Sequence, residues 1–399
     1  MTNDQICTRC IMDTSDPDIR FDENGECNHC RTYDELIKAY TFTGEEAQRR
    51  LSAIVDKIKK NGRNKECDCV IGVSGGVDST YNAYIAKKLG LRPLAVHLDN
   101  GWNSELANYN IERTLKGLDI DLYTYVIDWD EFRDLQLSYF KSGVINIEVL
   151  TDHAIRATLY KVANEKGIKY ILSGVNFATE AILPMSWGYS NFDVVNIKDI
   201  HRRFGKVKLK AFPTLSMAKF LYYQYAKGIR PVFLLDYVSY EKKEAKPFLQ
   251  KELDWKDYSG KHGESTFTYF YQSYILPRRL KVDKRRAHLS CLICSGEITR
   301  EEALKELQKP LFTEQELREN REYTIKKLGL TEKEFENYMD LPVRSHLDFK
   351  TNFISIYHLM ALKKLIAMPL SYVKKSLRIA LKPAKLLTKH LSRDSAKES

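Results

Sequence analysis

The chain has 399 residues, of which 43% are hydrophobic and 29% are charged. Length and composition fit a globular protein with one large α/β core and smaller attached pieces. No apolar run approaches the length that spans a bilayer, and the polar residues 1–10 lack the apolar core of a signal peptide. These features exclude a membrane-spanning class and lead us to expect a cytoplasmic protein.

The net charge of +10 is concentrated at the C-terminal end of the chain. Residues 350–399 contain eleven Lys and Arg against two Asp and Glu, and the other residues are nearly balanced. A nucleic-acid surface normally needs clustered excess positive charge. We therefore expect no nucleic-acid partner for the body of the protein.

Two Cys-x-x-Cys pairs near the N-terminus predict a structural zinc site. Cys7 and Cys10 are followed by Cys27 and Cys30, with sixteen residues between the pairs. This spacing is typical of four-cysteine zinc sites, whose ligand sphere is filled by sulfur and leaves no position for a reacting water. Disulfide pairing is the alternative, which a reducing cytosol disfavours.

A phosphate site is predicted where an apolar run ends in small residues. Residues 70–73 are typical of a buried strand, and Ser74, Gly75 and Gly76 follow before a helix that begins near Ser79. Glycines adopt left-handed backbone angles, so successive N–H groups can point into one concavity beside the positive end of the helix. An ordinary strand-turn-helix is the alternative.

The order Ser-Gly-Gly-x-Asp-Ser resembles the PP-loop of ATP pyrophosphatases and lacks the lysine of a Walker loop. The resemblance implies that ATP is cleaved to AMP and pyrophosphate, with AMP placed on a carbonyl or amide oxygen. It also implies that Asp78 holds Mg²⁺ against the pyrophosphate.

Strands and helices alternate along the central chain, which predicts a doubly wound parallel sheet. Two linking helices are expected within 33–60, and the strands are expected at 67–73, 93–98, 122–127 and 170–172. Ligands bind at the carboxyl ends of such strands. Asp99 follows the second strand and is predicted to meet the ribose or a metal, while Gly174 and Asn176 follow the fourth and are predicted to face the glycine loop. Plain turns and helix caps are the alternatives.

A polar block rich in aromatic residues, 255–272, predicts a half-buried pocket wall that contains Lys261, His262 and Glu264. A basic patch follows it, and we predict that this patch binds a pyrophosphate or the diphosphate of a nucleotide sugar. The patch consists of Lys281, Lys284, Arg285, Arg286 and His288. An ordinary solvated charge run is the alternative.

Taken together, the motifs resemble the N-acetyl sugar amidotransferases of bacterial surface-glycan and O-antigen pathways, within the PP-loop superfamily. The resemblance covers about residues 7–341. Its motifs lie at 7–14, 27–30, 74–79, 98–102, 261–265, 286–290 and 299–304.

The resemblance implies a reaction in which the acetamido group of a nucleotide-activated sugar becomes an acetamidino group. AMP on the amide oxygen would give an adenylated imidate that ammonia attacks, with metal and cationic side chains stabilising charge on the phosphates. His262 or Glu264 is expected to take a proton from ammonia. The predicted catalytic residues are Asp78, Lys261, His262, Glu264, Lys284, Arg285 and His288.

No glutaminase signature occurs in the chain, since residue 2 is Thr and no Gly-x-Cys-x-Gly elbow is present. Ammonia is therefore expected from a separate glutaminase with a barrel partner. The main rival hypothesis is a tRNA-thiolating PP-loop enzyme, which Cys67, Cys69, Cys291 and Cys294 keep open as iron–sulfur ligands. A non-catalytic ATP-binding scaffold is a further alternative.

We predict four parts in the chain. They are a zinc module at 1–40, linking helices at 41–65, a PP-loop amidotransferase domain at 66–345 and a basic tail at 346–399. In the tail, apolar residues recur at helical spacing through 370–381 with basic residues on the other flank. We predict weak contact of this helix with the anionic inner membrane surface, and packing on the body or on a partner subunit is the alternative.

Overall fold

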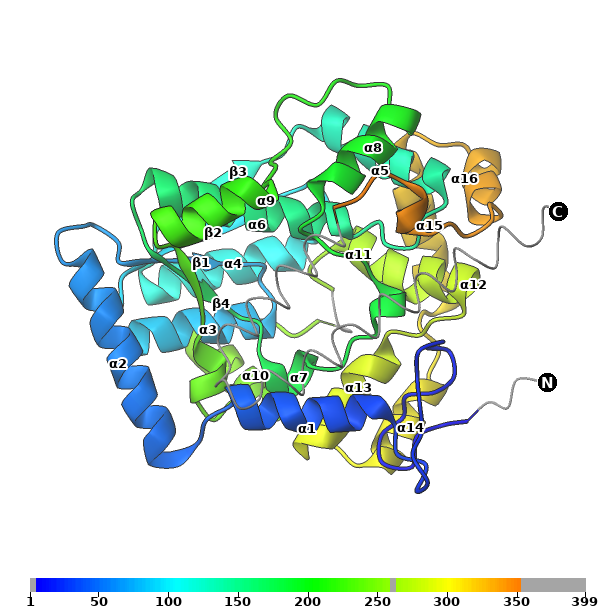
Figure 1. Cartoon of the computed structure of the whole chain (residues 1–399). Coiled ribbons are helices and arrows are strands. Elements are labelled where there is room, and N and C mark those ends of the chain that lie inside the picture. The colour runs from blue at the N-terminus through cyan, green and yellow to red at the C-terminus, as the bar shows by residue number, and fades with distance from the viewer. Residues whose placement is uncertain (1–4, 259–262, 353–399) are drawn as a thin grey trace, which may run out of the picture. The chain divides into compact units, whose positions relative to one another are not determined.

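The computed structural model of the chain describes residues 5–258 and 263–352 (Figure 1). Residues 1–349 form one compact unit and residues 350–399 a second. The predicted basic helix at 370–381 and the site candidates Lys261 and His262 lie outside the described residues. Within the described part of the chain, no helix is both long enough and apolar enough to cross a membrane.

The centre of the first unit is a five-stranded parallel sheet with the strand order β3-β2-β1-β4-β5. This order confirms the predicted doubly wound α/β fold, because the chain starts in the middle and winds outward to both edges. The strands are β1 Cys69–Gly72, β2 Pro93–Asp99, β3 Leu122–Val126, β4 Tyr170–Ser173 and β5 Arg230–Phe233.

Helices cover both faces of the sheet, as Figure 1 shows. Cys69 and Ile71 of β1 share a hydrophobic cluster with α2 (Gly44–Gly62), α3 (Val77–Lys88) and α4 (Glu105–Leu118). Val70 instead packs with α6 (Val149–Glu165) on the opposite face. Because side chains alternate along a strand, one short apolar run supplies both layers.

Before the sheet, α1 (Asn28–Tyr40) and α2 confirm the two predicted linking helices, separated at Thr43. Three features differ from the sequence-based expectations. Two concern the boundaries of elements, and one is an additional strand. Helix α3 begins at Val77, two residues before the expected start, so Asp78 lies in its first turn. Cys67 precedes β1 and is not on the strand. The fifth strand, β5, was not foreseen, because its four residues lie in an aromatic-rich segment without clear periodicity.

Besides α6, further helices follow α4 along the chain. Between β3 and β5 these are α5 Trp129–Ser142, α7 Phe177–Glu180, α8 Val194–Phe204 and α9 Met217–Leu221. After β5 they are α10 Lys242–Leu253, α11 Thr266–Phe270, α12 Leu276–Leu280, α13 Arg285–Ser295, α14 Arg300–Gln308, α15 Glu314–Leu328 and α16 Glu332–Met339.

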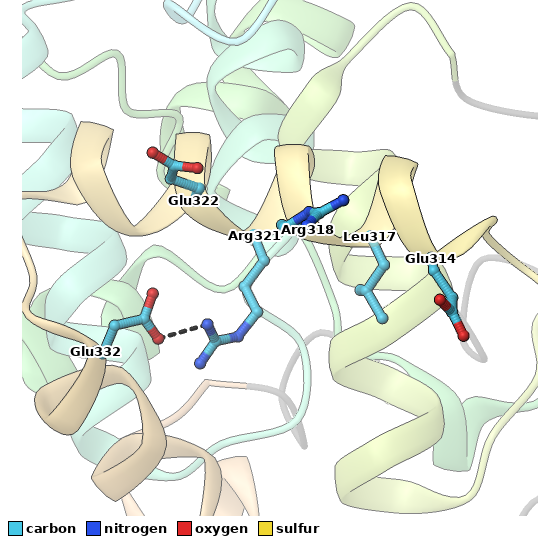
Figure 2. A pocket seen from close by; sticks show the side chains of 6 residues that line it. All are labelled: Glu314, Leu317, Arg318, Arg321, Glu322 and Glu332. Atoms are coloured by element: carbon cyan, nitrogen blue, oxygen red, sulfur yellow. Dashed lines mark ion pairs between the residues drawn. The ribbon is translucent and has the colours of Figure 1, made fainter.

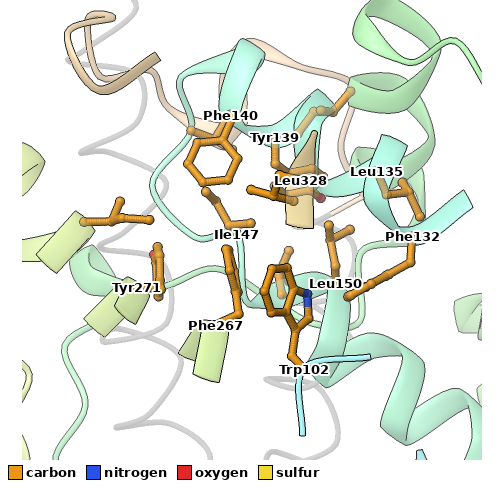
Figure 3. Close-up of a cluster of buried hydrophobic side chains, with 14 of the residues drawn as sticks. Trp102, Phe132, Leu135, Tyr139, Phe140, Ile147, Leu150, Phe267, Tyr271 and Leu328 are labelled. Carbon is orange, nitrogen blue, oxygen red and sulfur yellow. The ribbon is translucent and has the colours of Figure 1, made fainter. Parts of the chain in front are cut away.

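A large apolar core joins the C-terminal helices to the sheet domain. Trp102, which follows β2, lies in one cluster with Phe140 of α5, Phe267 of α11 and Leu328 of α15 (Figure 3). These four side chains are at most 1% exposed. The segment after residue 264 therefore packs as part of the same unit. This packing brings the polar residues of the segment near the ends of the strands.

Candidate functional site

The glycine loop joins the end of β1 to the start of α3, at the carboxyl edge of the sheet. Gly75 has a φ of +82°, and a Cβ built on it would lie 2.7 Å from the carbonyl oxygen of Ala107. Both the angle and the space therefore require glycine. Ser79 closes the loop, because its Oγ donates to the carbonyl of Gly76 at 3.0 Å and accepts from the N–H of Ser74 at 3.3 Å.

Two side chains hold the carbonyl oxygen of Gly75 in place through hydrogen bonds. Trp255 Nε1 donates to it at 2.8 Å and the Tyr258 hydroxyl at 3.0 Å. Both donors come from the aromatic block predicted as a pocket wall, 180 or more residues away in sequence. They fix the peptide orientation before a ligand arrives, which is the preorganisation that an anion site requires.

Asp78, in the first turn of α3, is held by two partners that the sequence did not suggest. Lys242 Nζ lies 3.1 Å from its Oδ2, and the Tyr240 hydroxyl donates to its Oδ1 at 2.5 Å. The side chains of Lys242 and Asp78 are 13% and 25% exposed. Lys242 stands at the start of α10, where nothing in the local sequence distinguishes it from its lysine neighbours.

The charges around Lys242 favour its cationic form. Burial by itself lowers the pKa of Lys242, but the carboxylates of Asp78, Glu180 and Glu297 outweigh burial and raise this pKa above its usual value. Burial also raises the pKa of Glu297. A cation surrounded by acids thus stands directly beside the loop that we predict to bind phosphates.

The loop after β4 meets the glycine loop closely. A Cβ built on Gly174 would lie 3.2 Å from the backbone carbonyl of Asp78, so a side chain here would crowd the start of α3. The prediction that the two loops face each other is confirmed. Asn176 caps α7 by accepting from the N–H of Thr179 at 2.9 Å. Its buried Nδ2 has no hydrogen-bond partner among the described residues.

Asp99 ends β2 and shapes the next turn. Its Oδ1 accepts from the N–H of Gly101 at 2.9 Å and lies 3.4 Å from Asn103 Nδ2. Asn103 Nδ2 is also 2.8 Å from His97 Nε2. The turn-forming alternative therefore describes the contacts seen, and a bond to a ribose stays a prediction.

Glu264 comes close to the glycine loop from the C-terminal segment. A Cβ built on Gly76 would lie 3.7 Å from its Oε1, and its carbonyl accepts from the N–H of Ser104 at 3.0 Å. Two site candidates that are 188 positions apart in the sequence are thus brought together. A carboxylate beside the loop can bind a cation or accept a proton there.

The residues of the predicted basic patch lie in different surroundings. Arg285 pairs with Asp283 at 2.8 Å and donates to the carbonyls of Glu306, Leu307 and Lys309, at the end of α14. Arg286 pairs with Asp13 at 3.0 Å. These contacts fasten α13 to the end of α14 and to the N-terminal segment, and a role for either guanidinium in binding a diphosphate stays a prediction.

Two further members of the patch have other surroundings. Lys284 faces the carboxylates of Glu148 and Asp152, which raise its pKa, although burial has the larger effect and lowers it. His288 is half-buried on α13, and its backbone N–H donates to the carbonyl of Lys284 at 3.4 Å.

The four N-terminal cysteines form a closed cluster. Cys7, Cys10, Cys27 and Cys30 are all 0% exposed, and their sulfurs lie within 4.8 Å of one another. Neighbouring Sγ atoms are 3.7 to 3.8 Å apart. Tetrahedral zinc with Zn–S bonds of about 2.3 Å needs sulfurs about 3.8 Å apart, so the four thiols fit zinc.

Within the described residues, this is the only group of three or more His, Cys, Asp or Glu side chains placed to share a metal ion. Cys294 Sγ also lies 4.0 Å from Cys30 Sγ, on helix α13. Since four sulfurs already complete the tetrahedron, Cys294 stands outside it. Asp78 lies outside this group.

Two surface cavities lie away from the glycine loop. One of about 520 Å³ is lined by residues of α15 and by Glu332, and Figure 2 shows that its Arg321 is paired with Glu332. Another of about 350 Å³ is lined mainly by aromatic side chains, with Arg50 and the buried Asp236. Neither contains a predicted site residue, so the cavities add no candidate to the site.

The sheet order defines a doubly wound α/β protein, and its glycine loop resembles that of the PP-loop ATP pyrophosphatases. Residues 264–363 match the family model described as LPS biosynthesis protein WbpG-like, C-terminal domain. The match confirms the predicted resemblance to proteins of surface-glycan biosynthesis. No curated protein matches the chain.

Three solved structures are similar to parts of the chain. A predicted subunit of tRNA methyltransferase from Methanocaldococcus jannaschii has 18% identity and a TM-score of 0.27, over 45% of this chain and 74% of its own. The NH3-dependent NAD synthetase from Campylobacter jejuni has 15% identity and a TM-score of 0.28, over 67% of this chain and 99% of its own. The NMN synthetase from Francisella tularensis has 16% identity and a TM-score of 0.28, over 68% of this chain and 99% of its own. At this distance the likenesses carry no functional argument.

Proposed function

We propose that the protein is an ATP-dependent amidotransferase of lipopolysaccharide biosynthesis. It converts the N-acetyl group of a nucleotide-activated sugar into an acetamidino group and releases AMP and pyrophosphate. The observation that carries this proposal is the position of Glu264. The first residue of the WbpG-like segment reaches the loop that is typical of ATP pyrophosphatases.

The reaction must overcome the low reactivity of an amide. Nitrogen donates electrons into the amide carbon, which makes that carbon a poor electrophile. Placing AMP on the amide oxygen gives an imidate with a good leaving group, and ammonia can then attack. The chain supports the first step with the backbone N–H groups of Gly75 and Gly76 and the positive end of α3, which attract the phosphates.

The residues around the loop fit ATP and Mg²⁺. When bound, Mg²⁺ supplies charge neutralisation of the phosphates, and Asp78 is the carboxylate placed to hold it. Lys242 adds a fixed cation beside this carboxylate. Electrostatic stabilisation of this kind is usually the largest contribution to such transfers. Lys261 and His262 stay proposed as catalytic residues from the sequence resemblance alone.

Ammonia is proposed to come from a separate glutaminase with a barrel partner. The rival is tRNA thiolation, for which four further cysteines are the candidate ligands of an iron–sulfur cluster. Cys67 and Cys69 adjoin β1, while Cys291 and Cys294 lie on α13 beside the zinc cluster. The described residues include all eight cysteines, and these four form no second group of three. The match of residues 264–363 to the WbpG-like family model favours the sugar amidotransferase.

The deciding experiment combines the protein, ATP and ammonia with a panel of nucleotide-activated acetamido sugars. We expect pyrophosphate release and the mass change that accompanies replacement of oxygen by an NH group in one sugar. Asp78→Ala should lower pyrophosphate release at least about 100-fold. The control is Asp130→Ala, an aspartate that is 74% exposed on α5, which should keep full activity.

A protein that leaves every acetamido sugar unchanged but thiolates tRNA would establish the rival. Pyrophosphate release that persists in Asp78→Ala would remove the glycine loop from the proposed reaction.

A further inference from the structure

The cavity of about 350 Å³ lies at the carboxyl edge of the sheet, beside the ends of β4 and β5. Phe177, at the start of α7, and Tyr237, shortly after β5, line it from the sheet domain. Tyr40, at the end of α1, and Phe42 line it from the segment between α1 and α2, and Figure 1 shows α1 next to α7. Since ligands of doubly wound folds bind at this edge, the cavity stands where a ligand site is expected.

The cavity presents aromatic faces to a planar ligand. The ring of Tyr40 stacks on that of Phe177 with centroids 4.8 Å apart, and the ring of Phe42 stacks on that of Tyr237 at 5.2 Å. Tyr40 is 44% exposed, so its ring is not part of the buried core. Accessible aromatic side chains are the usual platforms on which nucleic-acid bases stack. The two stacked pairs therefore favour a flat, aromatic ligand.

A buried carboxylate that lines the same cavity has one oxygen without a partner. Asp236 is 3% exposed, and its Oδ1 accepts from the N–H of Phe177 at 3.0 Å. No group among the described residues donates to its Oδ2, although this atom is not fully enclosed. Burial raises the pKa of Asp236 to about 6, and the N–H of Phe177 acts in the opposite direction. Because a buried carboxylate is costly unless its oxygens accept hydrogen bonds, Oδ2 indicates a ligand that donates one.

Arg50 supplies a cation at the same cavity. Its guanidinium lies over the ring of Phe42, 4.1 Å from the centroid, and its Nε donates to Glu46 at 2.6 Å. Neither of its Nη atoms makes a hydrogen bond to a residue that the structure describes. The free edge of a guanidinium matches the oxygens of a phosphate. Stacking faces, an acceptor for a base N–H and a cation for a phosphate thus line one cavity.

We propose that this cavity binds the nucleotide part of the activated sugar, with a base N–H donating to Asp236 Oδ2 and Arg50 contacting a phosphate. This inference rests on the proposed function and assigns residues that lie outside the sequence motifs. It gives the protein a second nucleotide site, distinct from the glycine loop predicted for ATP.

Two short segments connect the cavity to Asp78. Gly174, which lies against the backbone of Asp78, is three residues before Phe177. Tyr240, whose hydroxyl donates to Asp78, is three residues after Tyr237. Three residues span at most about 11 Å, so a substrate held by its base in the cavity can extend its sugar toward the glycine loop.

Calorimetric titration of the full-length protein with UDP, GDP, CDP and dTDP tests this site. The titrations are made with saturating α,β-methylene-ATP, an ATP analogue that cannot be cleaved to AMP and pyrophosphate. We expect at least one of the nucleoside diphosphates to bind under this condition. Asp236→Asn replaces the Oδ2 acceptor with an amide that donates, so it should weaken this binding about 10-fold or more.

Arg50→Met should weaken the same binding about 10-fold, because a charged contact with phosphate is lost. Arg49→Met is the matched control and should leave the affinity unchanged. Arg49 also pairs with Glu46, but it is 74% exposed and does not line the cavity. Tyr40→Leu, which removes a stacking face, is the further variant if Asp236→Asn does not fold, and it should weaken binding about 10-fold.

Absence of binding by all four nucleoside diphosphates, or binding that Asp236→Asn, Arg50→Met and Tyr40→Leu leave unchanged, would overturn this inference even if a sugar is converted. Loss of binding when α,β-methylene-ATP is added would also overturn it, because the cavity would then hold the base of ATP. Binding with the expected effects of the variants, in a protein that converts no acetamido sugar, would uphold the nucleotide site and reject the proposed function.

Discussion

The ammonium of Lys242 lies 3.1 Å from the carboxylate of Asp78, across 164 positions of sequence. One partner comes from the first turn of α3 and the other from the first turn of α10. The pair couples the glycine loop to a helix that the sequence motifs do not include.

Lys242→Met should lower the stability of the protein and its affinity for ATP. The substitution leaves Asp78 close to Glu180 and Glu297 without their central cation. Because Asp78 is a quarter exposed, we expect a loss in the free energy of unfolding between those of exposed and buried pairs, about 1–3 kcal/mol. Denaturant unfolding and ATP titration measure both effects.

Lys246→Met is the matched control, since Lys246 lies one turn further on α10 and pairs with Asp257 at 2.9 Å. Both side chains of that pair are 39% exposed, so its loss should cost less than about 1 kcal/mol. Equal effects of the two substitutions would contradict a special role of Lys242.

Cys27→Ser should release the zinc and loosen the N-terminal module. The four buried thiols form the whole ligand set, and structural zinc contributes its binding energy to folding. Metal analysis should find one zinc per wild-type chain and little in the variant. Limited proteolysis should detect exposure of the module.

Cys294→Ser is the control for the metal site. Its sulfur is 4.0 Å from Cys30 but lies outside the tetrahedron, so this variant should keep its zinc. Zinc loss in Cys294→Ser together with zinc retention in Cys27→Ser would reassign the ligands.

Phe140→Ala should destabilise the protein strongly. Phe140 is 0% exposed in the core of Figure 3, where it packs against Phe267 and Phe335. Removal of a buried phenyl ring typically costs about 3–5 kcal/mol. Val343→Ala, at a position that is 46% exposed, should change the free energy of unfolding by less than about 0.5 kcal/mol. If Phe140→Ala lowers the free energy of unfolding no more than Val343→Ala does, the C-terminal helices do not fold as part of this core.

Removal of residues 350–399 should abolish binding to anionic vesicles without removing catalysis. This segment holds eleven basic and two acidic residues, and each basic residue near an anionic surface contributes about 1 kcal/mol. Sedimentation with phosphatidylserine vesicles at low and high salt measures the binding. Equal binding by the full-length and shortened chains, or misfolding of the shortened chain, would favour packing of the tail on protein.

Local sequence determined the elements whose signals are short and strong. The four cysteines were predictable from spacing, because a Cys-x-x-Cys pair brings its two thiols together within one turn. The loop at 74–79 was predictable because only glycine permits the backbone of Gly75, and the continuous apolar run of β1 supplies both faces of the sheet.

Tertiary structure decided which distant side chains share a site. Lys242 carries no motif, and its importance comes from a partner far along the chain, Asp78. The basic run likewise did not reveal that the guanidinium of Arg285 donates to carbonyls at the end of α14, and its predicted role in binding an anion stays a prediction. The charge of a side chain can be read from the sequence, whereas the groups that neutralise it are fixed only when the chain folds.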